Sequence, residues 1–142
     1  MSADKSKMLA RLHRVRTLQL GLARADEVRH AEALASEHQL TQRISALVDA
    51  VAPTTQATGA HSLSAAAYYR ERLQKTADAA FTRVEMAERR ADAATEATRA
   101  AKRDQSAVEK LMERARQAAT MKEMRALEDA PGIPRGKRHG PC

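Results

Sequence analysis

A repeat of apolar residues, spaced alternately four and three residues apart, constrains this chain more than any other feature. It runs from Leu73 to Ala119, and twelve of its fourteen positions are apolar. A 3.5-residue repeat sustained over this distance is typical of a helix in a left-handed coiled coil. The sequence therefore predicts an all-α fold built on long helices. The repeat positions are Leu73, Ala77, Ala80, Val84, Ala87, Ala91, Ala94, Thr98, Ala101, Gln105, Val108, Met112, Ala115 and Ala119.

Breaking residues divide the chain into two long segments. The stretch PTTQATGAH at 53–61 combines a proline, poor helix formers and a glycine, which favours a hairpin tip. We expect a first helix over about 3–52 and a second over about 62–129, with Ser62 or Ser64 as its amino-terminal cap. Ala-Pro-Gly at 130–132 ends the second helix, and the composition of residues 131–142 predicts a disordered tail.

The first segment carries two apolar stripes whose relative phase is ambiguous around Val28, Ala31 and Ala35. Two helices with facing stripes and a short loop pack antiparallel, so we expect an antiparallel coiled-coil hairpin spanning 1–130. Its arms measure about 75 Å and about 100 Å, so the second arm overhangs. The stripes comprise Met8, Leu12, Val15, Leu18, Leu22 and Ala25, followed by Leu40, Ile44, Leu47 and Val51.

Composition argues against an enzyme. The chain has 31 alanines, one Phe, two Tyr and no Trp, so a wide core and a substrate pocket are not expected. No phosphate-binding loop, nucleophile motif or metal-ligand spacing occurs, and the five histidines are scattered. We therefore expect no catalytic residue, no metal and no cofactor.

Three features favour a cytoplasmic protein. The amino-terminal stretch lacks the apolar run of a secretory leader, and no window is apolar enough to cross a bilayer. The single cysteine, Cys142, has no partner for an intrachain disulfide. We expect no direct insertion into a membrane.

Charge is distributed unevenly along the predicted rod. Residues 1–24 carry six basic side chains against Asp4 alone, and the tail adds Arg135, Lys137 and Arg138. In an antiparallel hairpin these stretches lie at the same end, opposite the tip, so that end is basic and suits an acidic surface. Alternatives remain open at this point: solvated helix faces, nucleic-acid binding through phosphates, or a scaffold in which the repeat forms a dimer.

The tip region is the most apolar and aromatic part of the predicted rod. Tyr68 and Tyr69 follow the tip, and in a hairpin we expect them to face the stripe that includes Leu40 and Ile44. Either ring could simply cover the end of the repeat. An aromatic and apolar patch is also a candidate docking site.

The order of these features resembles the FliJ family of type III export proteins. The resemblance is carried by MLARLHRVRTLQLGLARADEVRHAEA in the first segment, SLSAAAYYRERLQ at the start of the second, and SAVEKLMERARQA followed by MRALEDA near its end. Members of this family are short antiparallel coiled coils similar to the central stalk of rotary ATPases. Where the family often has an aromatic three residues after its tyrosine, this chain has Arg72.

The resemblance implies a non-enzymatic stalk or adaptor, located in the bacterial cytoplasm at the face of the inner membrane. Its partners would be an export ATPase hexamer, an export-gate membrane protein and export chaperones, with no nucleic acid and a monomeric free state. The residues assigned to the ATPase-ring end are Arg11, Arg14, Arg16, Arg114 and Arg116. Those assigned to the gate end are Leu40, Ile44, Tyr68, Tyr69 and Leu73.

Overall fold

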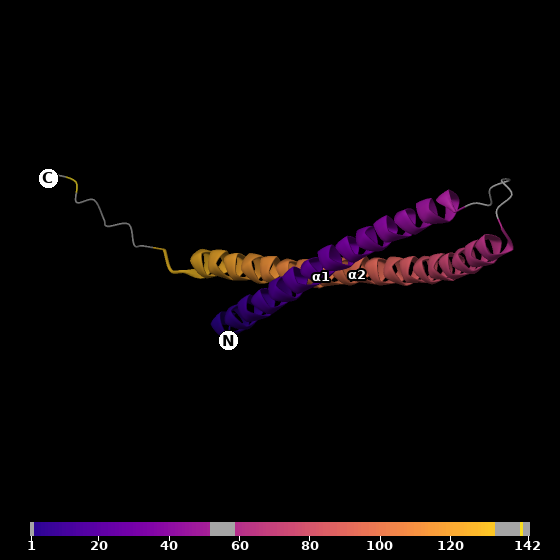
Figure 1. The fold of residues 1–142 in the computed structure, drawn as a ribbon. Helices are drawn as coiled ribbons and strands as arrows, with labels where there is room; N and C mark the ends of the chain where they lie inside the picture. The colour runs from indigo at the N-terminus through magenta and orange to yellow at the C-terminus, as the bar shows by residue number, and fades with distance from the viewer. Residues whose placement is uncertain (1, 52–58, 133–139, 141–142) are drawn as a thin grey trace.

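The protein is a hairpin of two long helices (Figure 1). In the computed structural model, which describes residues 2–51, 59–132 and 140, α1 spans Ser2–Ala50 and α2 spans Ala60–Asp129. The expected all-α hairpin is confirmed, and the helix ends lie within one or two residues of the expected ones. Most of the predicted tip and the predicted disordered tail, including Cys142, fall outside the described residues.

The ends of α2 follow from the local sequence. Its first turn is anchored at Gly59, whose carbonyl accepts hydrogen bonds from the backbone of Ser62 and Leu63. The expected cap by Ser62 or Ser64 is wrong, because the helix already begins at Ala60 and no side-chain cap is formed. At the other end Ala130 is extended, because the ring of Pro131 disfavours helical geometry in the residue before it.

Polar contacts between the helices establish the antiparallel register. His13 Nε2 lies 3.2 Å from Glu109 Oε1 near the amino terminus. Further along, Thr95 donates to Glu27, and Arg83 lies 3.3 Å from Glu37. As the residue number rises on α1, that of its partner falls on α2, and each pair sums to 120 or 122. The chain therefore doubles back on itself along nearly all of α1.

The seam, meaning the line along which the helices meet, follows the predicted repeat on α2. Thirteen of the fourteen repeat positions are buried or half-buried, and Ala119 alone is exposed. The most deeply buried are Ala80, Val84, Ala94, Gln105 and Val108. The sequence repeat thus identifies the packed face of α2, and the pairing ends within one turn of Ala119.

On α1 the seam has a different phase from the one predicted. Leu9, Leu20 and Ile44 are its deeply buried residues, and the predicted Val15, Leu18 and Leu22 are exposed. From the first predicted stripe, only Leu12 is even half-buried. The seam residues of α1 recur every three or four positions, all are buried or half-buried, and Val51 just after the helix continues the line: Leu9, His13, Arg16, Leu20, Ala23, Glu27, His30, Leu34, Glu37, Thr41, Ile44 and Val48.

The phase follows from helical geometry. Successive steps of seven residues back from Ile44 lead through Glu37 and His30 to Leu9. The same steps back from Leu22 lead to Val15 and Met8. These two tracks are offset by one residue, or about 100° around the helix, so an uninterrupted helix cannot bury both. The track through Leu9, Leu20, Ile44 and the half-buried Leu34 is continuous over the whole helix, and it forms the seam.

The packed interior is thin, and α2 extends beyond it. Among the described residues seven apolar side chains are buried, and four of them are smaller than leucine: Ala80, Val84, Ala94 and Val108. All residues from Gln117 to Asp129 are exposed, as are those from Ala60 to Tyr69. The predicted overhang of the second arm is therefore present, and it occurs at both ends of α2.

Candidate partner-binding surfaces

Polar side chains occupy nearly half of the α1 seam, and α2 provides space for them. Small alanines on α2 leave room in the seam for longer polar side chains on α1, which are half-buried and reach partners on α2. Arg16 lies 3.2 Å from Asp104 in this way, and Glu37 lies 3.3 Å from Arg83. These residues fix the register, and they are already engaged within the hairpin.

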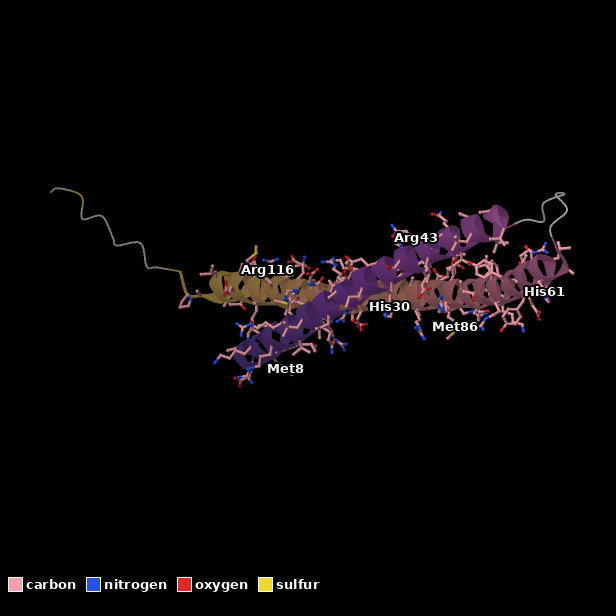
Figure 2. All side chains as sticks on the ribbon, viewed as in Figure 1. Met8, His30, Arg43, His61, Met86 and Arg116 are labelled. Atoms are coloured by element: carbon pink, nitrogen blue, oxygen red, sulfur yellow. The ribbon has the colours of Figure 1, made fainter. Side chains whose placement is uncertain are left out.

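The open end of the rod is formed by residues 2–16 of α1 and residues 110–129 of α2. Figure 2 shows Met8 on α1 and Arg116 on α2 at this same end of the molecule. A groove of about 840 Å³ lies between the two helices here, and its lining includes the apolar Leu9, Met112 and Ala115 as well as the charged Lys5, Lys122 and Glu123. The described part of the predicted basic end is thus brought together from both helices.

The five arginines assigned to the open end differ in their surroundings. Arg16 is half-buried and bonds Asp104 and Gln19, so its charge is used within the hairpin. Arg116 pairs with Glu113. Arg11, Arg14 and Arg114 are exposed, and none of the ion pairs found in residues 2–51 and 59–132 involves them. These three arginines are the best placed to contact a partner.

The residues assigned to the tip end do not form a single patch. Tyr68 and Tyr69 lie on the overhanging part of α2 and are 61% and 51% exposed. The contact between Glu37 and Arg83 places Leu40 about a dozen residues along α2 from the tyrosines, or roughly 20 Å. The tyrosines therefore do not face Leu40 and Ile44 as expected.

The remaining tip-end residues divide between the seam and the surface. Ile44 is buried and Leu73 half-buried, so both stabilise the hairpin itself, whereas Leu40 is 40% exposed at the seam's edge. Tyr68 is held by its neighbour: Arg72 donates to its hydroxyl at 3.2 Å, and the guanidinium lies 5.8 Å from the ring centre. The candidate tip surface is thus Tyr68, Tyr69 and the equally exposed Leu63.

Sequence reasoning missed a third surface, although its signal was visible. Met8, Val15, Leu18, Leu22 and Ala25, hereafter the outer stripe, lie on the side of α1 turned away from the seam, and all are exposed. Their helical spacing predicts a place in the seam, and the structure leaves them exposed instead. The hairpin leaves the outer stripe uncovered.

Within the described residues the hairpin offers neither a metal-ligand cluster nor a membrane-spanning helix. No three His, Cys, Asp or Glu side chains of that part of the chain converge to hold a metal ion. Neither α1 nor α2 contains a stretch apolar enough, over sufficient length, to cross a bilayer. Figure 2 shows the labelled histidines well apart, with His30 near the middle of α1 and His61 at the start of α2.

Compared with known proteins, the chain matches no family model, no curated protein and no solved structure.

Proposed function

We propose that this chain is a non-enzymatic stalk and adaptor of a flagellar or related type III export apparatus. In this role the open end enters a hexameric export ATPase, and the tip end contacts the export gate and chaperone-bound substrates. The protein would work in the bacterial cytoplasm, peripherally at the inner membrane. The proposal combines the resemblance of the sequence to the FliJ family with the geometry of the hairpin.

The observation that carries the proposal is the composition of the open end. Both helices contribute exposed arginines there, Arg11 and Arg14 from α1 and Arg114 from α2. A slender rod with positive charge on several sides of one end suits a ring whose inner loops are acidic, because charge complementarity guides such an encounter and sets its orientation. The exposed tyrosines at the opposite end provide a separate contact surface.

The direct test adds the purified chain to the export ATPase encoded in the same genome. We expect a larger hexameric fraction and faster ATP turnover at moderate salt. Arg11→Glu combined with Arg14→Glu should reduce both effects, while circular dichroism should show that the helices are retained. Arg89→Glu combined with Arg90→Glu is the matched control, because these arginines are also exposed but lie along the shaft.

Two results would contradict the proposal. In one, the unaltered chain leaves hexamer formation and turnover unchanged. In the other, the shaft variant is impaired as strongly as the open-end variant, which would indicate a nonspecific charge effect. Binding to duplex DNA that falls steeply with salt, without any effect on the ATPase, would favour the nucleic-acid alternative instead.

A further inference from the structure

The outer stripe is a helix face for which the hairpin supplies no partner. Leu18 and Leu22 are each 69% exposed, Met8 is 60% exposed and Val15 48%. An isolated exposed leucine is unremarkable on a protein surface, but here the apolar residues recur at helical spacing over about 25 Å. The seam on the opposite side of α1 already contacts α2. The outer stripe is an additional face, and at Leu22 it borders a groove that Ala93 and Ala97 of α2 also line.

The shape of this face suits another helix. Gly21 is exposed beside Leu18 and Leu22, and a Cβ atom added to it would meet no atom within 4 Å. Ala25 lies one turn further along the same side. Small residues between leucines allow a second helix to approach closely and to insert its own side chains between them.

Charge identifies the kind of helix. Between Asp4 and Asp26 the chain holds six basic side chains and no acidic one. Arg11 and Arg14 lie beside the outer stripe at its amino-terminal half, and both are exposed. A helix that covers the stripe therefore gains favourable charge pairing with these arginines if glutamate or aspartate flanks its apolar face.

Two other occupants are disfavoured, the first by charge and the second by the lack of aromatic residues. A second copy placed face to face on the outer stripe would bring basic residues against basic residues in either orientation. A bilayer surface is usually engaged by amphipathic helices with aromatic anchors, and residues 2–51 contain no Phe, Tyr or Trp.

We propose that the outer stripe of α1 binds an amphipathic α-helix of a partner protein, with acidic residues flanking the apolar face of that helix. This inference depends on the exposure and charge of α1 and not on the proposed role in export. It names a binding mode, a helix laid along a helix, that differs from the insertion of a charged rod end into a ring.

The test uses a fluorescent synthetic peptide of about three heptads, with leucine on one face and glutamate on both flanks. Fluorescence anisotropy should show binding to the full chain, weakened by salt. Leu18→Ser combined with Leu22→Ser should weaken binding at least about tenfold. The control is Leu111→Ser with Leu127→Ser, two exposed leucines on α2, which should leave binding unchanged. A peptide with lysine in place of glutamate should not bind.

Several outcomes would overturn the inference: no binding of the acidic peptide, equal binding of both peptides, or equal loss in the outer and control variants. Sedimentation that shows a dimer of the unaltered chain, dissociated by the Leu18 and Leu22 changes, would assign the stripe to a second copy. Flotation with anionic vesicles, lost in the same variant, would assign it to a membrane. The ATPase assay is independent, so failure of the export role is distinguishable from failure here.

Discussion

The side-chain amide of Gln105 donates a hydrogen bond across the seam to the hydroxyl of Thr17, at 3.1 Å. Its oxygen accepts a second bond from Lys102 at 3.0 Å, so both ends of the amide are satisfied although the residue is only 8% exposed. Gln105 is the one polar residue among the fully buried side chains of the described ranges. A buried polar group of this kind favours the alignment in which its partners are present.

Replacing Gln105 with leucine tests whether this residue contributes to the stability of the hairpin or to the choice of its helix alignment. We expect the free energy of unfolding to stay constant or rise by up to about 1–2 kcal/mol, because apolar contact is added to the seam. The fraction of dimer in sedimentation should increase, because a wholly apolar seam tolerates more alignments. Gln117→Leu, an exposed control, should change neither quantity. A decrease in the free energy of unfolding by more than about 1 kcal/mol, with no increase in the fraction of dimer, would contradict this interpretation.

Two leucines near each other on α1 test the phase of its seam. Leu20 is 3% exposed and Leu18 is 69% exposed. Leu20→Ala should lower the free energy of unfolding by about 2–3 kcal/mol, because it removes packed side-chain volume from a thin interior. Leu18→Ala should stay within about 0.5 kcal/mol of the unaltered chain. Urea denaturation followed by circular dichroism measures both, and the reverse order of effects would restore the phase expected from sequence.

Gly21 makes α1 less stable than an alanine at the same position would. It lies inside α1 with open space around its Cα. Gly21→Ala should raise the free energy of unfolding by about 1 kcal/mol, since alanine favours the helix and meets no neighbour. Gly132→Ala, beyond the end of α2, is the control and should have little effect. Thermal unfolding with no rise in Tm for Gly21→Ala would indicate that this turn of α1 is frayed.

The sequence was sufficient for α2 and insufficient for α1, for a physical reason. On α2 one apolar track runs without competition from Leu73 to Ala115, so periodicity alone identifies the buried face. On α1 two tracks compete, and the one that is buried includes Arg16, Glu27 and Glu37, whose burial depends on alanines across the seam. Which of the two tracks is buried depends on the residues of α2, and the periodicity of the first segment alone contains no information about them.

The candidate partner-binding surfaces were likewise predictable only in part. That the basic start of α1 and the last turns of α2 lie at one end follows from the antiparallel fold and could be predicted. The position of Tyr68 and Tyr69 beyond the paired part of α1 depends on the register, which is established by pairs such as Glu27 with Thr95. The spacing of the outer stripe is visible in the sequence, but its exposure depends on the seam lying on the other side of α1.

A single chain folds back so that Glu27 meets Thr95, whose hydroxyl donates to the carboxylate at 3.3 Å. The most direct measurement places cysteines at both positions, Glu27→Cys and Thr95→Cys, with Cys142→Ser to remove the natural thiol. With a short thiol crosslinker we expect a link within the monomer. The linked protein should run as a faster band on denaturing gels and have the mass of one chain. Links only between chains, or strong linking of the single Glu27→Cys variant to itself, would contradict the hairpin and indicate an intermolecular coiled coil.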